Sequence, residues 1–162
     1  MESTRVGTNG DLAVVGNDAI EILENDHRTI KQLLLDLTSA EEMARKQALE
    51  RLKALLTVHN ATEENLVYPA IHDLAERPMH ANGLYKEQDQ AKVAVFELSM
   101  LSPGDPEFTK KAAALRDAVY AHIEKEETSE FRHLREAAEA NMPELTAQVR
   151  RFRKEFVFSP SA

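Results

Sequence analysis

Apolar residues recur every three or four positions through most of the chain, with polar residues between them. This spacing places the apolar side chains along one face of an α-helix, because the helix completes a turn in about 3.6 residues. Four such segments follow one another between residue 17 and about residue 140. The pattern predicts an all-α protein, and the short connections favour an up-down-up-down four-helix bundle.

The first two predicted helices each carry one apolar seam. Asn17 is a candidate N-cap of the first, and Thr38-Ser39 marks its end. The second contains Pro69, whose missing N–H should kink or loosen the last turn near residues 70–74. The seam positions are Ile20, Leu23, His27, Ile30, Leu34 and Leu37, then Ala48, Leu52, Leu55, His59, Glu63 and Leu66.

The third and fourth predicted helices are separated by a turn that contains Pro103 and Gly104. Residues 77–83 are predicted to form a loop before the third helix. Asp105 should cap the fourth helix, with Pro106 at its first position. The seam positions are Leu84, Gln88, Ala91, Val95 and Leu98, then Phe108, Ala112, Leu115, Val119, His122 and Glu126.

The remaining segments are predicted to lie outside the four-helix core. Residues 1–16 should form a flexible N-terminal arm, residues 17–158 the bundle, and residues 159–162 a flexible C-terminus. Within the bundle, a short fifth helix beginning at Met142 should cover one end or side. We expect this helix to contribute packing and not chemistry, and we interpret its charged run at 150–154 as a solvated face.

Composition narrows the function. A chain of 162 residues is the size of one domain. Its net charge of −8 should repel nucleic acid and anionic membranes. Because the chain has no cysteine, any bound metal must use His, Asp, Glu or Tyr. The absence of an apolar run of membrane-spanning length and of a leader-like start predicts a cytoplasmic protein with no membrane partner.

Several seam positions hold polar residues where an apolar one is expected. Burying an unpaired imidazolium or carboxylate costs on the order of several kcal/mol, so a stable fold must supply partners or a cation. A bound metal would satisfy all of these side chains together. They are His27, His59, Glu63, Gln88, His122 and Glu126.

Two of the predicted helices carry an HxxxE motif, His59 to Glu63 and His122 to Glu126. Residues four apart lie one turn apart on the same helix face, so both side chains of each motif can reach one centre. Histidines with carboxylates suit iron, manganese or zinc, whereas calcium prefers oxygen alone. Two carboxylates between histidines of opposite helices can bridge two ions, which favours a dinuclear site.

The order of these ligands resembles that of the hemerythrin-like, HHE cation-binding family. The motif stretches are 26–30, 59–69 and 122–131, and the resemblance covers about residues 18–157. The resemblance implies a carboxylate-bridged centre of two irons that binds, senses or processes O₂, NO or peroxide, or handles iron. The implied ligands are His27, His59 and His122 as anchors and Glu63 and Glu126 as bridges.

The chain departs from the family where a Glu-His pair is usual early in the third helix, because it reads Glu87-Gln88. Gln88 could ligate weakly through its amide oxygen, hold a water, or leave a coordination position open. A single ion, zinc or manganese in place of iron, and substitution by Glu87 or His80 all stay open.

Other polar residues have simpler interpretations. We expect His72 and His133 at the surface, and Tyr68 as a core tyrosine that could also donate to a ligand or bind the metal. Glu64 and Glu127 should be solvated or support a ligand.

Two other functions are compatible with the sequence. Gln88 favours a bundle that has lost its metal and acts as a regulatory or interaction module. A mononuclear zinc or iron hydrolase with Glu87 as the base is a third interpretation. The sequence leaves open whether the protein is an enzyme.

Overall fold

The computed structural model describes residues 10–158, and within that range it contains helices and no strand. The predicted all-α class is therefore confirmed. The elements are α1 (Ala19–Asp36), α2 (Glu42–Thr62), η1 (Glu63–Val67), α3 (Tyr68–Asp73), α4 (Pro78–Ser99), α5 (Pro106–Lys125), η2 (Glu126–Glu130), α6 (Phe131–Ala137), η3 (Glu139–Asn141) and α7 (Met142–Phe158).

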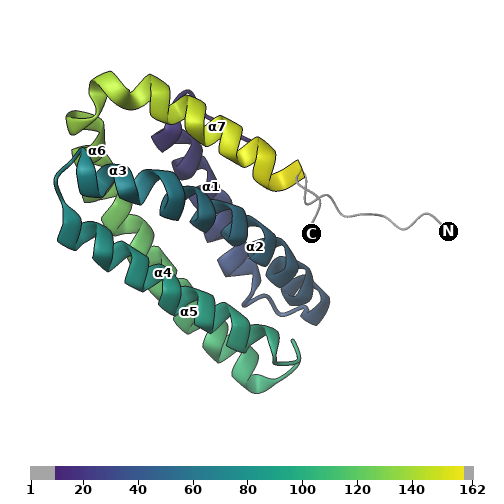
Figure 1. Ribbon diagram of the computed structural model, residues 1–162. Helices are drawn as coiled ribbons and strands as arrows, with labels where there is room; N and C mark the ends of the chain where they lie inside the picture. The colour runs from purple at the N-terminus through teal and green to yellow at the C-terminus, as the bar shows by residue number, and fades with distance from the viewer. Residues whose placement is uncertain (1–9, 159–162) are drawn as a thin grey trace.

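The helices form a bundle of long antiparallel rods (Figure 1). Helix α2 continues through η1 into α3 without a break, and α5 continues through η2 into α6. Helix α1 packs against α2 and α5, and α4 packs against α3 and α5. Helix α7 runs back along α1 and α2 (Figure 1). The predicted four-helix bundle with a fifth C-terminal helix is confirmed.

Side-chain caps mark the starts of α1 and α5, and two helix starts differ from the prediction. Asp105 caps α5 as predicted, accepting a hydrogen bond from the Glu107 N–H. Helix α1 is capped by Asp18 instead of Asn17, because the Asp18 side chain accepts from the Glu21 N–H. The predicted loop over 77–83 is wrong, since α4 begins at Pro78, whose fixed φ suits the first helical position.

Each of the two continuous rods contains one turn of π-helix, which the sequence pattern did not predict. The Tyr68 N–H donates to the Glu63 carbonyl, and the Phe131 N–H donates to the Glu126 carbonyl. Pro69 was expected to loosen the turn after it, but the irregular turn lies before it. A π-turn holds one extra residue, which shifts the buried seam after Glu63 by one position. Val67 is therefore buried, whereas Leu66 is half-buried.

The buried seam of α1 agrees with the prediction at all six positions. It also shows how the core is divided, because Leu23 belongs to one apolar cluster and Ile30 to another, and His27 lies between them. In the next rod, Leu55 and Val67 belong to opposite clusters in the same way. The bundle therefore contains a polar layer between two apolar cores.

The predicted flexible ends fall mostly on residues 1–9 and 159–162, outside the described part of the chain. Residues 10–16 lie against the bundle, where Asp11 pairs with Arg51 at 2.7 Å and Leu12 and Val14 pack on the apolar cores. Among residues 10–158, no helix combines the length and apolar character needed to cross a membrane.

Helix α7 differs from the prediction of a solvated charged face. Arg153 is buried, with 1% of the residue exposed, whereas the apolar Phe156 is 40% exposed. The physical reason is spacing, because Arg153 follows the buried Val149 by four positions and therefore lies on the same helix face.

Candidate metal centre

Four of the predicted ligands converge in the polar layer. His27 of α1, His59 of α2, Glu63 of η1 and Glu126 of η2 are all buried, and one ligand atom of each lies within 4.8 Å of the others. His27 Nε2 lies 3.2 Å from Glu126 Oε2, and His59 Nε2 lies 3.2 Å from Glu63 Oε1. Two imidazoles and two carboxylates from three rods thus face one point.

Three of these converging atoms lie close to one another but lack an aligned hydrogen bond. His27 Nε2, Glu63 Oε1 and Glu126 Oε2 are buried and have no aligned hydrogen-bond partner among residues 10–158. Leaving one such group unpaired in a protein interior costs about 1–3 kcal/mol, so three at one point are hard to explain as packing. A cation between them satisfies all three, and the donor set therefore fits a metal ion.

Acidic side chains orient both imidazoles. His27 Nδ1 lies 2.8 Å from Glu127 Oε1, and His59 Nδ1 lies 3.0 Å from Asp26 Oδ2. When Nδ1 donates to a carboxylate, the Nε2 lone pair is left for a metal, and this arrangement is usual for metal-binding histidines. Sequence reasoning had placed Glu127 in such a supporting role as one option and had missed Asp26.

Helix α7 completes the support of His59. Arg153 Nη1 donates to Asp26 Oδ2 at 2.7 Å, and Arg153 Nη2 donates to Asp26 Oδ1 at 3.3 Å. Although burial opposes ionisation, His59 and Arg153 lower the pKa of Asp26, so this carboxylate stays charged. The prediction that α7 contributes packing and not chemistry is therefore wrong. The available signal was the position of Arg153 on the buried face of α7.

The other side of the polar layer contains His122, Gln88 and the hydroxyl of Tyr68. Tyr68 Oη lies 2.5 Å from Glu126 Oε1, 3.0 Å from Glu63 Oε2 and 3.0 Å from His122 Nε2. The Gln88 amide donates to Tyr68 Oη at 2.8 Å and also to Glu63 Oε2. His122 Nε2 is 2.9 Å from Glu126 Oε1. All these groups are linked through the phenol.

The two proposed substitute ligands lie in different places. Glu87 supports His122, with Oε2 at 2.7 Å from His122 Nδ1, and is also paired with Lys125. His80 lies in the first turn of α4, where its side chain is 53% exposed and pairs with Glu130 at 2.9 Å. The structure brings Glu87 to the edge of the polar layer and leaves His80 outside the cluster.

The charges in the layer compensate one another. Burial favours neutral imidazole, but Glu63 and Asp26 raise the pKa of His59 to about 9. Burial likewise opposes the charge on His122, but Glu126 raises its pKa to about 9. The pKa of Glu126 is held far below its usual range, despite burial, by His122 and His27. Without a cation, protons on the imidazoles therefore balance the carboxylates, and metal binding must displace them.

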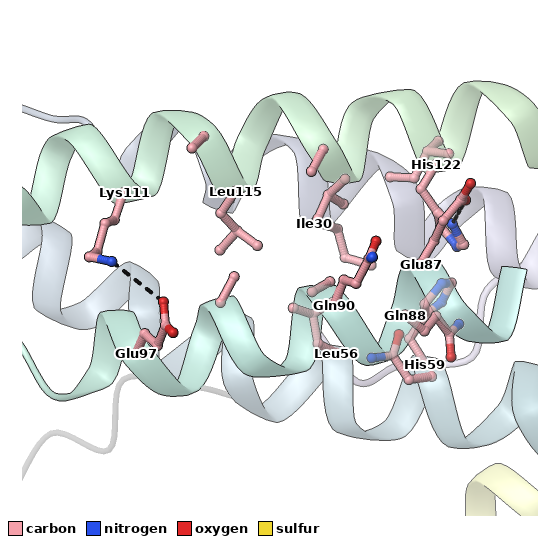
Figure 2. A pocket seen from close by; sticks show the side chains of 17 residues that line it. Ile30, Leu56, His59, Glu87, Gln88, Gln90, Glu97, Lys111, Leu115 and His122 are labelled. Carbon is pink, nitrogen blue, oxygen red and sulfur yellow. Dashed lines mark hydrogen bonds and ion pairs between the residues drawn. The ribbon is translucent and has the colours of Figure 1, made fainter. Parts of the chain in front are cut away.

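A pocket of about 280 Å³ leads to this layer between α4 and α5 (Figure 2). His59, Gln88 and His122 lie at one end of it, and the Lys111–Glu97 ion pair of 3.4 Å lies at the other (Figure 2). The wall between these ends is mostly small and apolar, with Ala91, Ala94, Leu115, Ala118 and Val119 among its residues, and it also contains Gln90 (Figure 2). A small uncharged ligand could reach the polar layer by this route.

The comparison with protein families agrees with this arrangement. The family described as Hemerythrin HHE cation binding domain matches residues 18–134. A curated protein named DNA nickase, from Nostoc sp. (strain PCC 7120), is 27% identical over 120 residues, which are 71% of this chain and 33% of that protein. The chain thus spans about a third of the length of this relative. No solved structure matches the chain.

Proposed function

The chain belongs to the hemerythrin HHE cation-binding family, and from this premise we propose that it holds iron in the polar layer and there binds, senses or processes a small ligand such as O₂, NO or peroxide. The observation that carries the proposal is the convergence of His27 Nε2, Glu63 Oε1 and Glu126 Oε2, buried and without aligned partners. His59 Nε2 joins them within 4.8 Å.

The donor set is compatible with iron and excludes ions that need a thiolate. Two imidazole nitrogens and two carboxylate oxygens suit Fe, Mn or Zn, and the described residues offer no thiolate that would select a softer ion. Iron, when bound, supplies one-electron redox chemistry that zinc lacks. Asp26 and Glu127 hold the imidazole rings in the orientation that an ion needs. Zinc and manganese remain the comparison metals for the experiment.

The pocket supports a small uncharged ligand. Its wall between α4 and α5 is mainly apolar, and His59, Gln88 and His122 are polar groups at the end nearest the polar layer. An apolar route limits the access of water to the ion. It therefore limits side reactions that would oxidise a reduced ion. O₂ and NO fit this route by size and by absence of charge.

We also propose that this chain by itself has no nucleic-acid partner. The Nostoc relative carries the name DNA nickase, but the chain spans about a third of that protein. A net charge of −8 opposes the contacts with phosphate that dominate DNA affinity. Conversion of supercoiled plasmid to the nicked form by the iron-loaded chain, above a metal-only control, would contradict this.

Metal counting tests the central proposal. The protein should be purified without an affinity histidine tag, and Fe, Mn and Zn should be counted per chain. We expect stoichiometric iron in the wild type and its loss in His59→Ala and Glu63→Ala. His72→Ala is the matched control, because that side chain is 49% exposed and pairs with Asp73 instead of the cluster.

Optical spectra of the ferrous protein, recorded anaerobically before and after addition of NO or O₂, then test the ligand. We expect new absorption bands in the wild type and none in Glu63→Ala. Wild-type protein without stoichiometric metal, even after loading, would overturn the proposal and favour a metal-free regulatory module.

A further inference from the structure

The polar layer has two halves that correspond residue by residue. In the two HxxxE rods, His59 corresponds to His122, Glu63 to Glu126 and Tyr68 to Phe131. The supporting carboxylates correspond as well. Asp26 holds His59 and precedes His27, whereas Glu87 holds His122 and precedes Gln88. A symmetric site would therefore offer the same ligands on both sides.

The halves differ at two pairs of corresponding residues, His27 with Gln88 and Tyr68 with Phe131. The contacts run between the halves, from His27 to Phe131 and from Tyr68 to Gln88. On one side, His27 presents its free Nε2 to the cluster, and Phe131 stacks on the His27 ring with centroids 5.8 Å apart and planes 5° apart. On the other side, the corresponding residues are Gln88 and Tyr68, and the Gln88 amide donates to the Tyr68 hydroxyl at 2.8 Å. Of the corresponding aromatic residues Tyr68 and Phe131, only Tyr68 adds a polar atom to the layer.

The Tyr68 hydroxyl lies where a second ion would bind. A cation held by Glu63 Oε2, Glu126 Oε1 and His122 Nε2 must lie about 2.0–2.2 Å from each of these atoms. Tyr68 Oη already lies 2.5–3.0 Å from the same three atoms. An oxygen and a metal ion cannot share a space of that size, so the second position is filled.

The orientation of Gln88 leads to the same conclusion. Its amide nitrogen faces Tyr68 and Glu63, where it donates two hydrogen bonds to oxygen acceptors. Reversing the amide would place its oxygen against the Glu63 carboxylate, which is repulsive. The amide oxygen is the only atom of Gln88 that could bind a cation, and it therefore faces away from Glu63 Oε2 and Tyr68 Oη.

We propose that the centre takes one metal ion, bound by His27, His59, Glu63 and Glu126, and that Tyr68 and Gln88 together occupy the place of a second ion. The inference rests on the proposed function and replaces the two ions that the sequence favours. Tyr68 and Gln88 act as positioning residues, because they hold Glu63 Oε2 and Glu126 Oε1. Each carboxylate is thereby left with one oxygen, Glu63 Oε1 or Glu126 Oε2, for the ion.

The number of ions per chain tests the inference. Metal-free protein would be titrated anaerobically with Fe(II), and separately with Mn(II), and bound metal counted after gel filtration. We expect one ion per chain in the wild type and in Gln88→His alone, because the phenol still fills the second position. The double variant Tyr68→Phe with Gln88→His should bind two. Tyr85→Phe is the matched control and should bind one, because the Tyr85 hydroxyl donates to the Glu64 carbonyl, outside the polar layer.

The electron spin resonance spectrum of the Mn(II)-loaded protein gives a second readout that does not depend on the variants folding. An isolated ion gives a six-line signal, whereas two ions bridged by carboxylates are magnetically coupled. Two ions in the wild type, or one in the folded double variant, would overturn the inference and leave the proposed function standing. No ion in the wild type would overturn the proposed function itself, so the two failures are distinguishable.

Discussion

At the scale of residues, the arginine of α7 stabilises the centre through Asp26. Arg153 and Asp26 are buried together, and Asp26 in turn orients the His59 imidazole. Removing one partner of a buried ion pair leaves an uncompensated charge, which costs about 3–5 kcal/mol. Losing the orientation of a metal-binding histidine typically weakens metal affinity by about 10–100-fold.

We therefore expect Arg153→Met to lower the free energy of unfolding by about 3–5 kcal/mol and to weaken metal binding by about 10-fold or more. Denaturant unfolding and metal titration measure the two effects. In the double variant Asp26→Asn with Arg153→Met the buried charge is gone, so we expect part of the stability to return and metal affinity to stay low. Full metal affinity in Arg153→Met would show that Asp26 orients His59 without it.

At the scale of elements, a tyrosine from α4 compensates for the proline that follows the π-turn. In this turn the Tyr68 N–H donates to the Glu63 carbonyl, so the next donor in the series would be residue 69 to the Glu64 carbonyl. Pro69 has no N–H, and the Tyr85 hydroxyl donates to that carbonyl at 2.7 Å instead. The corresponding turn at Glu126 contains no proline, so proline is not what produces the π-turns.

We expect Tyr85→Phe to lower the free energy of unfolding by about 1 kcal/mol, because the Glu64 carbonyl loses its donor. In Tyr85→Phe with Pro69→Ala the backbone N–H is restored, and the loss should become smaller. Thermal or denaturant unfolding of the four proteins of this cycle measures the coupling between Pro69 and Tyr85. Additive effects of the two substitutions would contradict the compensation.

Sequence periodicity predicts the rods, because apolar spacing is a local property, and it places His27, His59, Glu63 and Glu126 on buried faces. It does not predict the π-turns, because a single inserted residue changes the phase of the seam only after the turn. The supporting pairs are missed for a related reason. Asp26 and Arg153 are far apart in the chain, and their partnership depends on how α7 packs against α1.

The contacts of the Tyr68 hydroxyl are a feature that residue spacing does not predict. Spacing marks Tyr68 as an amphipathic core residue, and it is fully buried as such a residue should be. Its contacts with Glu63, Glu126 and Gln88 come from three different elements and appear only in three dimensions. The sequence contains the signal only as a difference between the two HxxxE rods, a tyrosine in one and a phenylalanine in the other.

At the scale of the whole molecule, the polar layer couples stability to pH, because it lies between the two apolar cores. Leaving the paired Asp and Glu side chains aside, the direction in which stability changes with pH follows from the pKa values of the histidines. The pKa values of His59 and His122 are raised from 6.5 to about 9 in the folded, metal-free protein. A raised histidine pKa contributes stability that is fully present below about pH 6.5 and is lost as pH rises through about 9.

We therefore expect the metal-free protein to lose a few kcal/mol of stability, to order of magnitude, between about pH 6.5 and pH 9. The metal-loaded protein should behave differently, because an ion replaces the His59 proton that faces the cluster and binds more tightly as that proton becomes easier to remove. The difference in melting temperature between loaded and metal-free protein should grow steadily over this range, and calorimetry of both forms at several pH values measures it. A difference that is constant with pH would mean that the imidazoles are already neutral in the metal-free layer. Imidazole protons could then not be what balances the charge of the buried carboxylates.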